Sequence, residues 1–439
     1  MIDYTDKIIT VEQALDMVRD GFNITTAMAA AEPVAFQSKL HTIADRVHNI
    51  TITSCLPTMD YEYLQEKYLA ETDAFWLHCW FYTPILRKLH HTGRVSFIPN
   101  NLHFAGSKRN AAKHTDIFLS SASMPDEDGN VYLSCSNVYE SVIMEECDKI
   151  ILECSPNIPR VRGDSFVPLS KVDHIILTDY YLPALPDGKS NERDELIGKH
   201  IAGLINDGDT IQVGIGGIPN AVCASIADKK DLGVHTEMMT TGIMRLMKQG
   251  VVTNKRKNLE PGKSVFAFAY GTQEMYEFMN ENDDLLMRSG AWVNDPYVVG
   301  LNDNMVSINT TVEIDLTGQC CSESVGFKQI SGTGGQSDTA TGALRSKNGK
   351  SIIALYSTTT LKNKQTGEAE EISKIVPVLK EGAIVSLSRN DVDYVVTEQG
   401  VAYLRGLDIR LRVEALIAVA HPKFRDELYT AAKEYGYLM

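Results

Sequence analysis

The feature that most constrains this chain is an order of elements that occurs twice. In the first half the order is Asp20-Gly21, a strand at Asn23–Ala27, a small-residue turn at Ala29–Pro33 and a helix. In the second half it is Asp207-Gly208, a strand at Thr210–Val213, a glycine turn at Gly214–Gly217 and a helix that opens at Pro219. Proline suits the first helical position because its missing N–H would have no partner there. The repeat predicts two units of one design, and chance similarity is the alternative.

Two further pairs of segments recur in the same order. Asp116–Leu119 followed by Asp128–Val131 resembles Val306–Asn309 followed by Asp315–Gln319, and Val172–Asp179 resembles Val392–Glu398. Three ordered matches favour duplication over chance. The halves should meet near residues 183–195, where prolines and the pairs Asp187-Gly188 and Ser190-Asn191 are typical of a polar linker.

Strands and helices alternate through both halves. The strands expected besides those above are Ile50–Ser54, Val95–Pro99, Ile151–Cys154, Val265–Ala269, Ile352–Leu355 and Ala383–Leu387. Helices are expected at 11–20, Val413–Ala420 and Phe424–Tyr435. This order favours largely parallel sheets with helices on their faces. We predict an α/β fold of two similar open-sheet domains, residues 1–188 and 189–439.

Charge and composition argue against several classes of partner. The 439 residues carry a formal net charge of −15, which disfavours nucleic acid or an anionic membrane as the main partner. No stretch approaches the roughly 20 apolar residues of a membrane helix, and Met1-Ile2-Asp3-Tyr4 does not begin a signal-peptide pattern. The eight cysteines include no CxxC pair. We therefore expect reduced thiols and a cytoplasmic protein.

The glycine turn Gly214-Ile215-Gly216-Gly217 is the first candidate for ligand binding. Glycines allow a backbone to approach a ligand closely, and a helix N-terminus favours anions. The turn does not complete the dinucleotide fingerprint, because Pro219 stands where the third glycine would be. A tight turn without a ligand is the alternative reading.

Glu237 is the candidate for covalent chemistry. It follows a short predicted strand that ends at His235-Thr236-Glu237, and a carboxylate can act as a nucleophile. A solvated carboxylate is the alternative, and His235 is expected to be structural rather than a general base. The scattered histidines form no ligand cluster, so no metal site is expected.

Two further segments could stabilise an oxyanion. Gly332–Asp338 holds three glycines, which suits a turn whose N–H groups point at a developing charge. Asn294 precedes Asp295-Pro296 and could donate its side-chain amide. The alternatives are a surface loop and a plain Asx-turn.

Seven ordered motifs give the chain a resemblance to a known family. They are GIGGIP, HTEM, NDP, SGTGGQSD, ISKIVP, VDYVVTEQGVAYLRG and AHPKFRDEL. In this order they resemble the acetyl-CoA hydrolase/transferase family of class I CoA-transferases, over nearly the whole chain. The resemblance implies a NagB/RpiA-like CoA-transferase fold of two similar domains with the active site between them.

The resemblance also implies roles for individual residues. Glu237 would be the nucleophile, and Asn294 and Gly335 would form the oxyanion hole. The coenzyme A site would be lined by Gln212, Val213, Gly214, Ile215, Gly216, Gly217, Val312, Gly335 and Lys362. The alanine turn of the first half fits a chain in which only one half keeps the coenzyme A loop. Acyl selectivity is expected from Ala29–Glu32 and Cys55–Thr58.

The reaction implied is ping-pong transfer of coenzyme A between a short acyl-CoA, such as 4-hydroxybutyryl-CoA or butyryl-CoA, and a small carboxylate such as acetate. It runs through a glutamyl-CoA thioester on Glu237. No permanently bound cofactor is needed, because coenzyme A and acyl-CoA are substrates. An acyl-CoA hydrolase on the same site is the second reading, and a ligand-binding or regulatory module is the third. The family also implies a homodimer.

Overall fold

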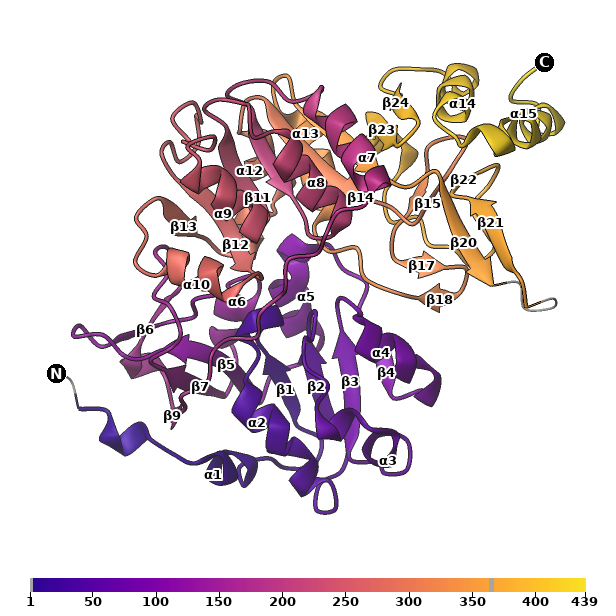
Figure 1. The fold of residues 1–439 in the computed structure, drawn as a ribbon. Coiled ribbons are helices and arrows are strands. Elements are labelled where there is room, and N and C mark those ends of the chain that lie inside the picture. Colours follow the sequence, from indigo (N-terminus) through magenta and orange to yellow (C-terminus); the bar gives the residue numbers. More distant parts are fainter. Residues whose placement is uncertain (1–2, 363–366) are drawn as a thin grey trace. The chain divides into compact units, whose positions relative to one another are not determined.

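The first half of the chain builds one open sheet of seven parallel strands (Figure 1). The computed structural model describes residues 3–362 and 367–439. The strand order is β4-β3-β2-β1-β5-β7-β9, and each neighbouring pair is parallel. The bounds are β1 Asn23–Thr26, β2 Ile50–Ser54, β3 Phe75–Cys79, β4 Val95–Phe97, β5 Ile117–Ser123, β7 Lys149–Ser155 and β9 His174–Leu177.

The second half builds a sheet with the order β13-β12-β11-β10-β14-β19-β23-β24. The bounds are β10 Thr210–Val213, β11 Gly233–Met239, β12 Ser264–Ala269, β13 Leu285–Met287, β14 Met305–Thr310, β19 Lys350–Ala354, β23 Tyr394–Thr397 and β24 Gly400–Tyr403. β24 is antiparallel to β23. The remaining seven strands follow one another along the chain and across the sheet as their first-half counterparts do. The predicted α/β duplication is therefore confirmed.

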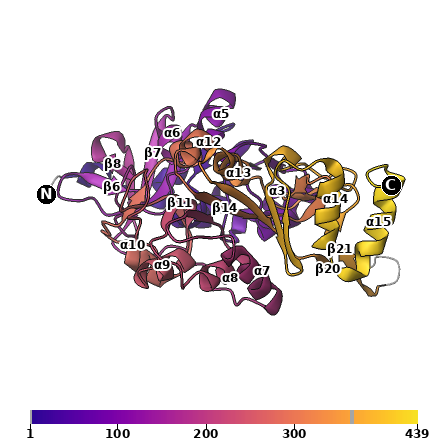
Figure 2. The same ribbon diagram turned by 90° about the horizontal axis from the view of Figure 1, so that it is seen from above.

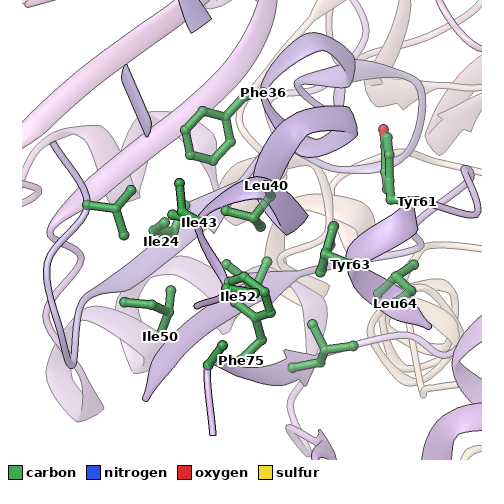
Figure 3. Close-up of a cluster of buried hydrophobic side chains, with 14 of the residues drawn as sticks. Ile24, Phe36, Leu40, Ile43, Ile50, Ile52, Tyr61, Tyr63, Leu64 and Phe75 are labelled. Atoms are coloured by element: carbon green, nitrogen blue, oxygen red, sulfur yellow. The ribbon is translucent and has the colours of Figure 1, made fainter. Parts of the chain in front are cut away.

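Apolar residues on one face of the first sheet form its core (Figure 3). Ile24, Ile52 and Leu77 come from three adjacent strands, while Phe36 and Leu40 come from the segment that follows β1. Fully burying one such side chain stabilises a fold by about 1.5–3 kcal/mol. Since side chains alternate along a strand, the intervening residues of β2 and β3 face the other way and are largely polar.

A separate core cluster lies towards the end of the chain. It joins Ile353 of β19 and Val395 of β23 to the last two helices, through Leu416 and Leu428. Figures 1 and 2 both show these helices, α14 (Ile409–Ala418) and α15 (Arg425–Glu434), side by side. Their predicted existence is confirmed, with bounds shifted by a few residues.

Two compact units can be separated in the chain, and they do not follow one sequence boundary. The first contains the chain up to Asp187 together with Thr236–Met244 and Lys263–Asn294. The second contains Gly188–His235, Arg245–Gly262 and Asp295–Met439. The predicted domain limits, 1–188 and 189–439, describe the two copies of the repeat and stay a prediction. In the division into compact units, Glu237 and Asn294 belong to the first unit.

Three local predictions were wrong. Ala383–Leu387 forms no strand, because only Leu387 makes a bridge, to Cys320, and Ile384 and Val385 are exposed. The helix predicted at 11–20 ends at Leu15. The helix after the glycine turn begins at Gly217, two residues before Pro219.

The remaining elements complete the description. The helices are α1 Val11–Leu15, α2 Val34–Lys39, α3 Glu66–Leu69, α4 Pro84–Leu89, α5 Ala105–Ala112, α6 Glu140–Met144, α7 Glu192–Ala202, α8 Gly217–Ser225, α9 Thr241–Lys248, α10 Gln273–Met279, α11 Gly290–Val293, α12 Pro296–Gly300, α13 Gln336–Arg345, α14 Ile409–Ala418 and α15 Arg425–Glu434. The short strands are β6 Asn130–Tyr132, β8 Phe166–Pro168, β15 Glu313–Asp315, β16 Cys320–Cys321, β17 Ser324–Val325, β18 Lys328–Gln329, β20 Thr358–Lys362, β21 Ala369–Ser373 and β22 Ile375–Val376. Within residues 3–362 and 367–439, none of the helices has the length and apolar character needed to cross a bilayer.

Candidate active site

Glu237 lies inside β11, two residues before the end of the strand, so its predicted place at the strand end was wrong. The other residues of β11 are buried, whereas Glu237 is half-buried. Its Oε2 accepts a hydrogen bond of 2.9 Å from Nδ2 of Asn294. The two residues are 57 positions apart in the sequence, and the structure brings them together as the resemblance implies.

Asn294 is held rigidly between two short helices. It caps the C-terminus of α11, where its N–H donates to the carbonyl of Gly290 at 3.0 Å, and its side chain is fully buried. The next residue, Asp295, caps α12 by accepting from the N–H of Tyr297 at 2.8 Å. The Asx-turn considered for this segment therefore belongs to Asp295. The amide of Asn294 is left to donate to Glu237.

The charge of Glu237 affects the pKa of a buried thiol, Cys55. Burial raises the pKa of the Cys55 thiol well above its usual value, and negative charge at Cys79, Glu237 and Glu140 raises it further. A thiol with a raised pKa stays protonated and is a poor nucleophile. Glu237 is therefore a better candidate for covalent chemistry than Cys55.

A second carboxyl in the first unit, Glu140, is already fully occupied. It accepts from the N–H of Met28 at 2.9 Å, from the hydroxyl of Ser136 at 2.6 Å and from the N–H of Tyr139 at 2.9 Å. Glu140 is completely buried, and burial raises its pKa. No motif in the sequence pointed to this residue. Its position at the start of α6, equivalent to Gln336 at the start of α13, is the signal that could have revealed it.

The two segments expected to set acyl selectivity meet in the first unit. The carboxyl of Glu32 accepts from the N–H of Thr58 at 3.2 Å and also from the Thr58 hydroxyl. Glu32 is buried, and burial raises its pKa to about 8. It therefore carries its proton at neutral pH, unlike an ordinary glutamate. The pairing shows that Ala29–Glu32 and Cys55–Thr58 act as one structural group.

In the glycine turn of the second unit, Gly216 and Gly217 are each required for a different structural reason. Gly216 has φ 120° and ψ −177°, a conformation that residues with a side chain avoid. At Gly217, an added Cβ would overlap the carboxylate of Asp194. Within the part of the chain that the structure describes, no acceptor takes a hydrogen bond from the N–H of Ile215, Gly216 or Gly217. The turn can thus offer backbone donors to an anion.

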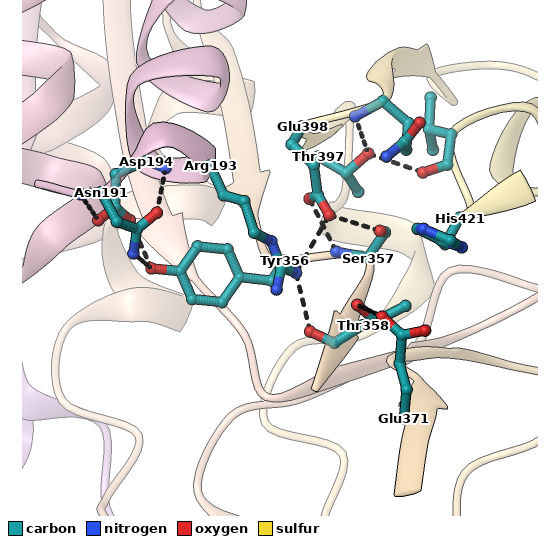
Figure 4. Close-up of polar contacts among 12 residues, drawn as sticks. Asn191, Arg193, Asp194, Tyr356, Ser357, Thr358, Glu371, Thr397, Glu398 and His421 are labelled. Atoms are coloured by element: carbon teal, nitrogen blue, oxygen red, sulfur yellow. Dashed lines mark hydrogen bonds and ion pairs between the residues drawn. The ribbon is translucent and has the colours of Figure 1, made fainter. Parts of the chain in front are cut away.

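Asp194, whose carboxylate lies beside Gly217, belongs to a polar network (Figure 4). Its Oδ1 accepts from the hydroxyl of Tyr356 at 2.6 Å, and its Oδ2 accepts from the N–H of Asn191 at 2.9 Å. Arg193 lies over the Tyr356 ring at 4.3 Å from its centre and pairs with Glu398 at 3.1 Å. Because the Asp194 carboxylate is held on several sides, Gly217 has no room to gain a side chain.

The other residues predicted to touch coenzyme A differ in what they offer. Val213 is fully buried, and the side chain of Gln212 accepts hydrogen bonds from the hydroxyl of Ser307 and from the N–H of Ile308. Both side chains therefore stabilise the sheet. Val312 is half-buried between β14 and β15. Lys362 is exposed at the end of β20. Gly214 and Ile215 stand at the open end of β10 with Gly216 and Gly217.

Gly335 sits at the N-terminus of α13. It is the N-cap residue, and its carbonyl accepts from the N–H of Thr339 at 2.9 Å. The preceding Gly334 has φ 53°, which the turn uses to enter the helix. Gly332–Asp338 is therefore an ordered helix entry and not an open surface loop. Gly335 belongs to the second unit, and Glu237 and Asn294 to the first.

Comparison with known proteins identifies the family. The acetyl-CoA hydrolase/transferase N-terminal domain matches residues 1–185, and the C-terminal domain of the same name matches residues 271–432. The 4-hydroxybutyrate coenzyme A transferase of Clostridium kluyveri is 40% identical over 98% of both chains. The butyryl-CoA:acetate CoA-transferase of Anaerostipes caccae is 35% identical over 98% of this chain and 97% of its own. The crystal structure of RipA from Yersinia pestis has a TM-score of 0.89 at 35% identity, covering 99% of both chains.

The chain belongs to the acetyl-CoA hydrolase/transferase family. Within it, the whole-length similarity to named transferases makes the protein an enzyme of the CoA-transferase class.

Proposed function

We propose that the protein moves coenzyme A between a short-chain acyl-CoA, 4-hydroxybutyryl-CoA or butyryl-CoA, and a small carboxylate such as acetate. The observation that carries the proposal is the 2.9 Å hydrogen bond from Asn294 to the half-buried carboxylate of Glu237. It supplies a fixed nucleophile with an amide donor beside it. The names of the two transferases above support the choice of acyl groups.

In this proposal Glu237 attacks the thioester carbonyl of the acyl-CoA and expels coenzyme A as a thiolate. The thiolate then attacks the glutamyl carbonyl of the resulting anhydride, which releases the first carboxylate and leaves a glutamyl-CoA thioester. The incoming carboxylate attacks this thioester, and the same two steps run in reverse. One thioester replaces another, so little free energy is lost and neither ATP nor a metal takes part.

Each step passes through an oxyanion, for which we assign Asn294 and the N–H of Gly335 as donors. Asn294 Nδ2 already lies at hydrogen-bond distance from Glu237. A single donor of this kind is worth about 3 kcal/mol in the transition state of other acyl-transfer enzymes. The Oδ1 atom of Asn294 is buried and accepts no hydrogen bond within the described ranges. The orientation of this amide is therefore set by what its nitrogen binds.

We assign the coenzyme A moiety to the glycine turn Gly214–Gly217, together with Gln212, Val213, Val312, Gly335 and Lys362. The support is the set of backbone donors on the turn and the open position of Ile215, which is 38% exposed. Binding energy from this distant part of the substrate can be used to stabilise the transition state at the acyl end. Coenzyme A is then a substrate and not a resident cofactor. The homodimer and the cytoplasmic location stay predictions.

A hydrolase on the same residues is the second candidate function, since the family's name includes both activities. Water that reached the anhydride or the thioester would divert the reaction to hydrolysis. Measuring free coenzyme A with and without acetate separates the two. A transferase releases little free coenzyme A in either mixture and forms acetyl-CoA when acetate is present, whereas a hydrolase releases free coenzyme A at the same rate in both.

The test of the mechanism is chemical trapping. The enzyme is incubated with butyryl-CoA alone, treated with borohydride and digested, and the masses of its peptides are measured by mass spectrometry. We expect Glu237 to be reduced to the alcohol, because borohydride reduces a thioester and leaves a carboxylate intact. The Glu140 peptide is the internal control, since that carboxyl is fully buried and should stay unmodified.

The variant Glu237→Gln completes the test, with an expected loss of kcat on the order of 10³-fold or more. An unmodified Glu237 peptide from an enzyme that transfers coenzyme A at its normal rate would overturn the proposal.

A further inference from the structure

Three basic side chains gather on the polar face of the first sheet without an acid among them. Arg109 comes from α5, Lys113 directly follows α5, and His78 comes from β3. The partners of Arg109 Nη2 are Asn23 Oδ1 at 3.1 Å, Thr53 Oγ1 at 2.6 Å and His78 Nδ1 at 3.3 Å. Lys113 Nζ donates to Thr51 Oγ1 at 2.7 Å. All of these partners are neutral acceptors.

Arg109 is more than nine-tenths buried, with 7% of its surface exposed. Its Nε is buried and donates no hydrogen bond within residues 3–362 and 367–439. Buried guanidinium groups are normally paired with an anion, because neutral acceptors only partly replace the water lost on burial. Arg109 therefore holds a buried positive charge that is not paired with a carboxylate among the described residues.

Electrostatics of the cluster agree with its geometry. Burial lowers the pKa of Arg109 to about 10. Burial, followed by the charges of Arg109 and Lys113, lowers the pKa of His78 to about 4. Burial and the charge of Arg109 also lower the pKa of Lys113, which Asp116 only partly offsets. The chain has 57 acidic residues against 42 basic ones, so the lack of a carboxylate paired with Arg109 does not reflect a shortage of acids.

A small ligand would meet the cluster at its partly exposed members. His78 and Lys113 are half-buried, and Thr51, Thr53 and Asn23 beneath them are buried hydroxyl and amide groups. Nη2 of Arg109 is fixed by its three acceptors, which holds the guanidinium plane in place. Planar, fixed guanidinium groups recognise phosphate and carboxylate oxygens well.

We propose that Arg109, Lys113 and His78 form a binding site for a small oxyanion, a phosphate or a carboxylate, that is separate in its residues from the group around Glu237. The bound oxyanion accepts from Lys113 Nζ and from the guanidinium, and it supplies the negative charge that the cluster lacks. The proposal does not depend on the transferase mechanism.

The test measures the thermal midpoint of the whole enzyme during titration with inorganic phosphate, with sulfate or with formate, at constant ionic strength set by chloride. A ligand that binds only the folded state raises the midpoint in a saturable way. We expect saturable rises with at least one oxyanion. Phosphate and sulfate acting alone would identify a phosphate-type site, and formate acting would identify a carboxylate site.

Variants tie any rise to the cluster. Lys113→Gln should abolish most of the shift, while Lys108→Gln, an exposed lysine of the same helix packed on Phe104 at 4.8 Å, should leave it unchanged. Arg109→Gln should abolish the shift too, if that variant folds. As a second readout, histidine NMR should show the pKa of His78 rising when the oxyanion binds. No saturable rise with any of the three ions, or an undiminished rise in Lys113→Gln, would overturn the proposal.

Discussion

The equivalent strands β1 and β10 lead into turns that have opposite surroundings. In the first unit, Ala29, Ala30 and Ala31 are fully buried, and the N–H of Met28 is bound by Glu140 at 2.9 Å. In the second, Ile215 and Gly216 are exposed, and their N–H groups have no acceptor among the described residues. The third residue after the strand has a positive φ in both turns, 53° at Ala29 and 120° at Gly216. Both turns thus have a positive φ at this position, but the groups that surround the two turns differ.

The difference fits the proposed function, in which one design serves structure in the first copy and, as we propose, coenzyme A binding in the second. Ligands in open α/β sheets bind where the strand order reverses, beyond the carboxyl ends of the strands. In the first unit, the carboxylate of Glu140 already accepts the donors that an anionic ligand would use. In the second, the equivalent helix position carries Gln336, whose Nε2 donates to the carbonyl of Thr310 at 2.9 Å. Among the described residues, no carboxylate accepts from the N–H groups of Ile215, Gly216 and Gly217.

The largest effect that would test this comparison is on stability. In Glu140→Ala, the N–H groups of Met28 and Tyr139 and the hydroxyl of Ser136 lose their acceptor in a buried place. We expect a loss of about 3 kcal/mol in the free energy of unfolding of the first unit, because unsatisfied buried donors are costly. Urea unfolding of the wild type and variant measures it, followed by hydrogen exchange to locate the change.

Glu140→Gln is the matched control, since its amide oxygen can still accept part of the network. We expect it to lose clearly less than Glu140→Ala. Equal stabilities for the wild type and Glu140→Ala would show that the carboxylate does not close the first turn.

The contrast between the two turns was partly visible in the sequence. The repeated strand order and the exchange of glycines for alanines predicted two similar sheets with one coenzyme A loop, and the sheets are confirmed. Closure by Glu140 was missed, because it joins residues 112 positions apart. No local pattern encodes such a contact. Ala383–Leu387 was misassigned since its apolar residues look like a strand, although pairing with a neighbour decides whether a strand forms.

The candidate site shows the same division. The motif order predicted roles for Glu237 and Asn294, but their spacing in the sequence could not show that the two side chains are in contact. The glycines of the turn were expected to admit a ligand. The structure adds a reason that the sequence hides: the Asp194 carboxylate fills the space beside Gly217.

A smaller effect, on the KM for butyryl-CoA, should distinguish the function of the second turn from that of the first. Gly216→Ala places a side chain at φ 120°, where strain of about 1–3 kcal/mol forces the backbone to shift. We expect the KM for butyryl-CoA to rise by about 10- to 100-fold, which corresponds to about 1.4–2.8 kcal/mol of binding. Steady-state kinetics with acetate held saturating measure the change.

Ala29→Gly is the paired variant at the third position of the first turn. Its φ of 53° suits glycine, so the stability should change by less than about 1 kcal/mol and the KM should stay the same. A rise in KM for Ala29→Gly as large as that for Gly216→Ala would mean that the first turn also contacts the substrate.

The smallest expected effect concerns pH. The carboxyl of Glu32, at the end of the first turn, has its pKa raised by burial from 4.5 to about 8. The folded state therefore binds more protons than the unfolded state between about pH 4.5 and 8, and stability falls as pH rises through this window. Glu32→Gln removes that proton, so its stability should fall less between pH 6 and pH 7, by about 1 kcal/mol. Thermal midpoints of both proteins across this range measure the difference. Parallel curves would show that the proton on Glu32 does not contribute to the pH dependence of stability. The buried first turn would then tolerate a charged carboxylate as readily as the open second turn.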